Sequence, residues 1–74
     1  MQSPFLDTDA VELPIGLSMR LSAHPEAALI FGNMSLDEKR MAIRYVQGGI
    51  SGEDAKRRIE NAVRQMEQGQ TQIT

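Results

Sequence analysis

His24 is the only side chain in this sequence that could serve as a conventional general base near neutral pH. It directly precedes a proline, and no serine or carboxylate constellation can be assigned to it. The adjacent acidic pairs Asp37–Glu38 and Glu53–Asp54 could do acid–base or metal chemistry. Each pair follows a serine at an expected helix start, where capping and the helix dipole account for it. The sequence therefore predicts a protein that is not an enzyme and has no catalytic residues.

Metal and cofactor sites are also not expected. The 74-residue chain has no cysteine and one histidine, which excludes cysteine-ligated zinc and an imidazole-rich site. The glycine-rich stretch 48–52 precedes an expected helix, as phosphate loops do, but it lacks their Gly-Lys-Ser/Thr ending. The two acids that follow it would also repel a phosphate. We therefore expect no metal and no cofactor.

Basic residues in two expected helices could form a surface patch. They are Lys39, Arg40 and Arg44, followed by Lys56, Arg57 and Arg58. A solvated helix face is the more common explanation of such a pattern, and the formal net charge of −2 argues weakly against a dedicated nucleic-acid binder. The same region faintly resembles a helix-turn-helix, but its second helix would begin with two acids. Nucleic-acid binding through these basic faces is kept as the alternative function.

Helix signals divide the chain into four expected helices. Residues 13–21 fit either a strand or a helix, and we choose a helix because no second strand is available to pair with it. A second helix begins at Pro25 and ends near Gly32-Asn33. Serine caps at Ser35 and Ser51 begin the third and fourth helices, which run to about residues 47 and 69.

These elements predict an all-α fold, a small four-helix bundle. Residues 1–10 are expected to be a flexible arm, residues 11–69 a single helical domain, and residues 70–74 a disordered tail. The longest apolar run, residues 27–31, is too short to insert into a membrane, and we see no signal peptide. A cytoplasmic location is the default expectation.

The first expected helix is apolar on two sides. Its leucines lie on one face, whereas Ile15 and Met19 lie on another. So small a domain can rarely cover both faces, so we expect this patch to be buried against a partner. The leading function is therefore a protein-interaction module whose partner is unknown, with a two-fold homodimer as the default. The expected partner-binding residues are Ile15, Met19, Met41, Tyr45, Arg57 and Arg58.

Several short motifs occur in a fixed order over residues 12–69. They are Leu13-Pro-x-Gly16-Leu17, Pro25-Glu-Ala, Phe31, Tyr45-Val46 and Arg57-Arg58-Ile59. This order resembles the helical module of the bacteriocin-protection family, also called YdeI or OmpD-associated proteins, or related short uncharacterised bacterial proteins. Gly49-Ile50 and Asp54-Ala55 depart from its pattern. The resemblance implies an all-α module without known catalytic residues and a link to stress or antimicrobial-peptide tolerance.

Overall fold

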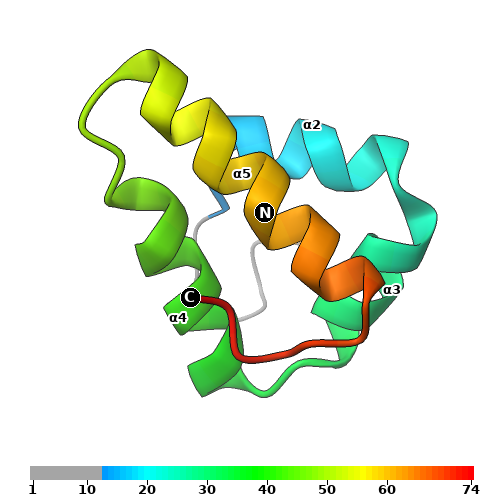
Figure 1. Cartoon of the computed structure of the whole chain (residues 1–74). Coiled ribbons are helices and arrows are strands. Elements are labelled where there is room, and N and C mark those ends of the chain that lie inside the picture. Colours follow the sequence, from blue (N-terminus) through cyan, green and yellow to red (C-terminus); the bar gives the residue numbers. More distant parts are fainter. Residues whose placement is uncertain (1–12) are drawn as a thin grey trace, which may run out of the picture.

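The structure, a computed structural model, describes residues 13–74 as four helices joined by short turns (Figure 1). The helices are α2 (Ile15–Ala23), α3 (Pro25–Asn33), α4 (Leu36–Gln47) and α5 (Gly52–Glu67). This part of the chain contains no strand, so the predicted all-α fold is confirmed, and residues 13–21 lie largely in a helix. The expected arm at residues 1–10 lies outside the described residues.

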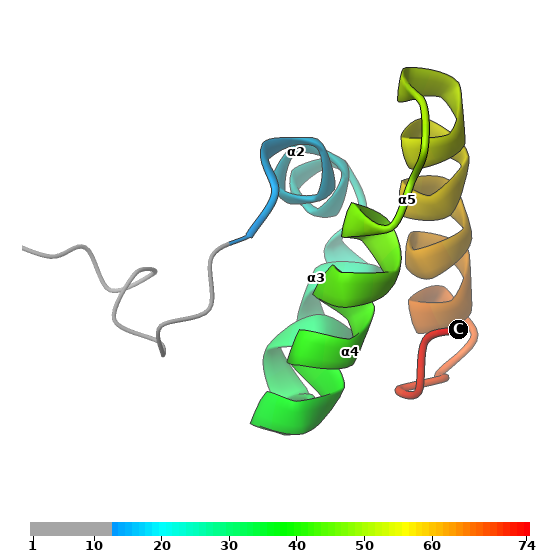
Figure 2. The ribbon, with the colours of Figure 1, turned by 90° about the vertical axis from the view of Figure 1, so that its left-hand side faces the viewer.

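Helix α5 is the central element of the fold. It contacts each of the other three helices, and α2 also contacts α3. Figure 2 shows α5 on one side of the molecule and the other three helices on the opposite side. The core between them is mostly aliphatic, and Phe31 is the one aromatic among its buried side chains within residues 13–74. Its buried side chains are Leu17, Leu21, Ala27, Phe31, Met34, Ala42, Ile43, Val46, Ala62, Val63, Met66 and Ile73.

Both predicted serine caps are present at the helix starts. The backbone N–H of Glu38 donates to Ser35 Oγ at 3.1 Å, and the backbone N–H of Ser35 donates to Glu38 Oε1 at 2.9 Å, which completes a capping box. Ser51 Oγ accepts from the backbone N–H of Asp54 at 3.1 Å. These caps satisfy backbone donors that a helix start leaves unpaired, and they fix where α4 and α5 begin.

Two predicted helix ends are confirmed. α3 ends at Asn33, and the chain leaves it in an extended conformation at Met34. The burial of Met34, which is 5% exposed, accompanies this change of direction. Gly69 follows the end of α5 with a φ of 87°, a left-handed conformation that glycine adopts at little cost.

Residues 70–74, which were expected to form a disordered tail, pack against the helices. Ile73 is 1% exposed and belongs to the core. Thr71 Oγ1 donates to Glu38 Oε2 at 3.0 Å, and the Gln65 amide donates to the Thr74 carbonyl at 3.2 Å. Burial of one isoleucine and these bonds order the segment, so the packed domain extends beyond residue 69, through residue 74.

Candidate functional site

Helix α2 presents two different apolar faces, as its sequence predicts. Leu17 and Leu21 are buried against the core, at 0% and 7% exposed. Ile15 and Met19 lie one turn apart and are 77% and 68% exposed. Large aliphatic side chains with this exposure stabilise nothing within the domain, so they are the first candidates for contact with another molecule.

A groove of about 470 Å³ lies beside this exposed face, between α2 and the first half of α5. We call it the α2–α5 groove. Its small or apolar lining residues are Gly16, Met19, Gly52, Ala55 and Ile59. Its charged lining residues are Arg20, Lys56 and Glu60. The groove thus has an apolar lining interrupted by a few charged groups, which is the usual character of a binding cleft.

The absence of a side chain at Gly16 allows α2 and α5 to approach closely here. A β-carbon on Gly16 would lie 2.8 Å from Ile59 Cδ1, closer than ordinary van der Waals contact. A glycine inside a helix costs roughly 1 kcal/mol relative to alanine. Ile59, which is only partly buried, occupies the space that this glycine leaves and packs against the core.

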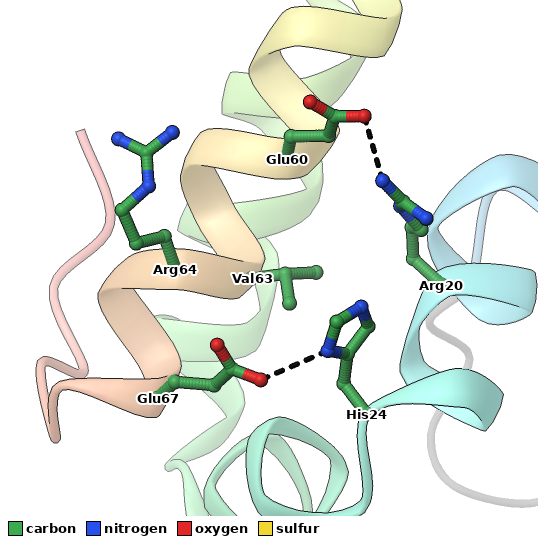
Figure 3. A pocket seen from close by; sticks show the side chains of 6 residues that line it. All are labelled: Arg20, His24, Glu60, Val63, Arg64 and Glu67. Carbon is green, nitrogen blue, oxygen red and sulfur yellow. Dashed lines mark hydrogen bonds and ion pairs between the residues drawn. The ribbon is translucent and has the colours of Figure 1, made fainter.

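An ion pair and a histidine–carboxylate hydrogen bond hold α2 and the turn after it against α5 (Figure 3). Arg20 Nη2 lies 2.6 Å from Glu60 Oε2, and His24 Nδ1 lies 2.9 Å from Glu67 Oε2. Val63 lies between the pairs in a hollow of about 220 Å³. The two contacts join α2 and the turn after it to α5, beside the α2–α5 groove.

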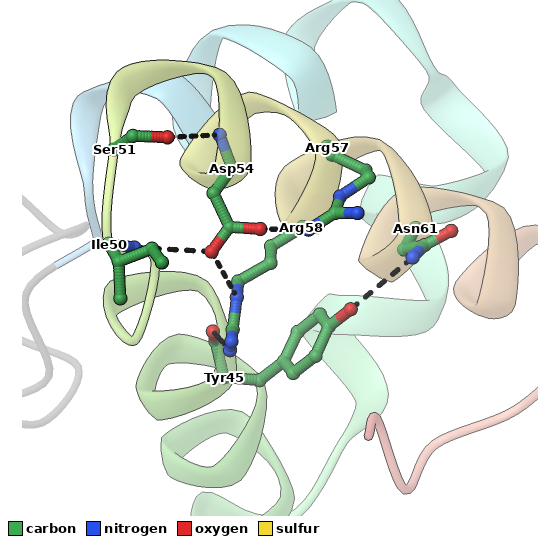
Figure 4. A network of polar contacts seen from close by, with 7 residues as sticks. All are labelled: Tyr45, Ile50, Ser51, Asp54, Arg57, Arg58 and Asn61. Carbon is green, nitrogen blue, oxygen red and sulfur yellow. Dashed lines mark hydrogen bonds and ion pairs between the residues drawn. The ribbon is translucent and has the colours of Figure 1, made fainter.

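A network centred on Asp54 fixes the start of α5 (Figure 4). The Asp54 carboxylate accepts from Arg57, from the backbone N–H of Ile50 at 3.1 Å and from Arg58 Nε at 3.3 Å. Arg57 and the Ile50 N–H hold the pKa of Asp54 below its ordinary value. This network determines how the loop between α4 and α5 leads into the α2–α5 groove.

The same network engages Tyr45, which was expected to bind a partner. Arg58 Nη1 donates to the Tyr45 carbonyl at 2.9 Å, and its guanidinium lies 5.1 Å from the centroid of the Tyr45 ring. The Tyr45 hydroxyl accepts from Asn61 Nδ2 at 3.3 Å. Tyr45 and Arg58 therefore join α4 to α5 by contacts within the domain.

The six expected partner-binding residues do not form one surface. Met19 lines the α2–α5 groove, and Ile15 precedes its lining residue Gly16. Tyr45, Arg57 and Arg58 gather at the Asp54 network instead. The remaining residue, Met41, is 42% exposed on α4 and does not line the groove.

Sequence reasoning missed the α5 wall of the groove, formed by Gly52, Ala55, Lys56 and Ile59. The one local signal for it was Gly16, since a glycine within a helix indicates a close approach of another element. A second overlooked feature is Ile50, which is 91% exposed two residues before Gly52.

Across residues 13–74, His, Asp and Glu side chains form no group of three or more that could hold a metal ion. None of the helices in this range is long and apolar enough to span a bilayer. No family model, curated protein or solved structure gives a match to this chain. The resemblance to the bacteriocin-protection family stays a prediction from the sequence.

Proposed function

We propose that this chain is a protein-interaction module that binds its partner in the α2–α5 groove and catalyses no reaction. The observation that carries the proposal is the exposure of Ile15 and Met19 beside an apolar groove. Removing apolar surface from water stabilises a complex by about 25 cal/mol per Å² before the costs of association are counted. These side chains contribute little to the domain itself, so this gain is available to a complex.

The lining of the groove favours a protein segment over a small molecule. Small-molecule sites combine an enclosed apolar cavity with several converging polar groups. Here Arg20 and Glu60 bind each other, and the groove is open along two helices. An apolar groove between helices is typical of proteins that bind the apolar face of another helix.

The proposal is tested by capturing partners on the immobilised full chain from extracts of the cells that produce it. Wild type is compared with Met19→Lys and with Leu29→Lys. Leu29 is 66% exposed on α3 and lines neither the groove nor the hollow, so it is a matched control. We expect a partner that wild type and Leu29→Lys retain and that Met19→Lys loses.

The captured protein is then purified and added to the labelled full chain. Binding in the groove should shift the methyl resonances of Met19 and Ile59 and leave that of Leu29 in place. Equal capture by all three chains, or shifts confined to other methyl groups, would contradict the proposal.

We further propose that, without another protein, two copies associate through the same surface as a two-fold homodimer. Sedimentation equilibrium should show a dimer at micromolar concentrations that Met19→Lys weakens. A dimer of unchanged strength in both Ile15→Lys and Met19→Lys would place the interface elsewhere. A bacterial cytoplasmic location and a link to antimicrobial-peptide tolerance are proposals that rest on the sequence and the resemblance alone.

A further inference from the structure

The charges of the α2–α5 groove are not balanced. Arg20 and Lys56 are its cations and Glu60 is its one anion. Because Glu60 binds Arg20 at 2.6 Å, these two charges largely cancel. Lys56 is exposed and forms no ion pair within residues 13–74, so the lining retains about one positive charge at this residue.

This charge selects among ligands that fill the apolar part of the groove equally well. A ligand carboxylate near Lys56 would form a charge-assisted contact at the edge of a partly dehydrated surface. A ligand ammonium at the same place would be repelled by Lys56, and it could not readily pair with Glu60 because that carboxylate already binds Arg20. Charge of this kind acts mainly on the choice of partner and on the association rate.

We infer that the partner segment is an acidic amphipathic helix of another protein. This inference rests on the proposed function, in which the groove binds a protein. The apolar face of the segment lies against Met19, Ala55 and Ile59, and a carboxylate on its flank pairs with Lys56. Anchors one helical turn apart suit a groove that runs between two helices.

A second copy of the chain fits this charge less well. Its exposed apolar pair beside the groove, Ile15 and Met19, lies on α2, whose nine residues include Arg20 and no acid. A two-fold dimer through this surface would bring two unpaired Lys56 side chains to one interface, and the Arg20–Glu60 pairs would leave no free carboxylate in the lining to meet them. The homodimer is therefore the weaker complex, and an acidic partner should displace it.

Two synthetic peptides of about four helical turns test the inference. They share two leucines one turn apart, and their other positions are rich in glutamate in one peptide and in lysine in the other. Each is titrated into the full chain while the methyl resonances of Met19 and Ile59 are followed. We expect the acidic peptide to shift both resonances and to bind at least about tenfold more tightly, a difference of about 1.4 kcal/mol.

Charge reversal within the chain provides the matched variants. Lys56→Glu should invert the preference, so that the basic peptide binds more tightly. Arg40→Glu makes the same change of charge at an exposed residue of α4 outside the groove, so it should leave the preference unchanged. Met19→Ser, which removes the apolar side chain without adding a charge, should weaken binding of both peptides.

The possible failures separate the inference from the proposed function. Equal affinities for the two peptides, with both methyl groups shifted, would overturn the acidic partner and leave a groove that binds protein. Methyl shifts that depend only on the concentration of the chain itself would identify a second copy as the occupant of the groove. This result would also overturn the acidic partner. If neither the peptides nor concentration shifts Met19 or Ile59, the groove is not a binding site and the proposed function fails.

Discussion

Gly49 lies so close to Ala55 that there is no room for a side chain between them. A β-carbon on Gly49 would lie 2.7 Å from Ala55 Cα and 2.8 Å from its backbone nitrogen. The φ of Gly49 is outside the left-handed region, so this close approach, and not the backbone conformation, requires glycine. The contact places the first turn of α5 against the loop after α4, where the α2–α5 groove begins.

Gly49→Ala should therefore destabilise the domain. Because the obstruction is backbone, no change of rotamer can relieve it, and the cost should be about 1–3 kcal/mol of unfolding free energy. Gly32→Ala is the control, since a β-carbon there meets nothing within 4 Å inside a helix, and it should stabilise by about 0.5–1 kcal/mol. Urea denaturation measures both. Equal effects of the two substitutions would show that the Gly49 contact is looser than described.

Loss of either serine cap should lower stability by a smaller amount. Ser35→Ala and Ser51→Ala each remove a hydroxyl that accepts from a backbone N–H, at a cost of about 1 kcal/mol. Ser22→Ala provides the comparison, because its exposed hydroxyl only donates to a carbonyl one turn earlier in α2 and should matter little. Thermal melts in which all three variants match wild type would contradict the assigned starts of α4 and α5.

Acid should weaken the fold through Glu38 and Asp54. The Ser35 backbone N–H and the Thr71 hydroxyl lower the pKa of Glu38, and Arg57 and the Ile50 N–H lower that of Asp54. A carboxyl with a lowered folded-state pKa stabilises the fold above its unfolded pKa, and this contribution is lost as the pH falls through the folded value. Unfolding free energy should thus be nearly constant near neutrality and decrease below about pH 4.

Asp54→Asn separates this effect from general acid unfolding. The variant should be less stable than wild type at neutral pH, and its stability should decrease less steeply in acid. Urea denaturation across this pH range measures both slopes. Parallel curves for the two proteins would show that Asp54 is ionised equally easily in the folded and unfolded chains.

Ile73→Ala should reveal the contribution of the C-terminal segment. Ile73 is 1% exposed, so truncating it creates a cavity that should cost roughly 2 kcal/mol or more. Ile50→Ala is the matched change at a side chain that is 91% exposed. Its unfolding free energy should lie within about 0.5 kcal/mol of that of wild type. Similar melting temperatures for both variants would show that residues 70–74 do not pack stably against the helices.

Local signals were sufficient to predict the four helices. Ser35 and Ser51 cap their helices through bonds to residues three positions on, so the information lies within one turn. Ala62, Val63 and Met66 are buried on the face of α5 that their helical spacing indicates. Both signals depend on neighbours in the chain and need no knowledge of the tertiary structure.

Features that depend on distant residues were predicted poorly. Ile73 is one apolar residue among polar ones, so no periodicity indicates its burial. Exposure of Ile15 and Met19 could be predicted because a two-sided helix cannot bury both faces in so small a domain. The groove beside them could not be predicted. It depends on the approach of Gly16 to Ile59 and on the pairing of Arg20 with a residue 40 positions away.

The central position of α5 has a consequence for how this chain folds as it is synthesised. Among the four helices of residues 13–74, α5 is the last to leave the ribosome, yet the other three pack against it. Until Ala62, Val63 and Met66 have emerged, the earlier helices have no surface against which to complete their burial. A nascent chain that ends before α5 would expose apolar residues such as Leu17 and Val46, so it should bind chaperones or be degraded.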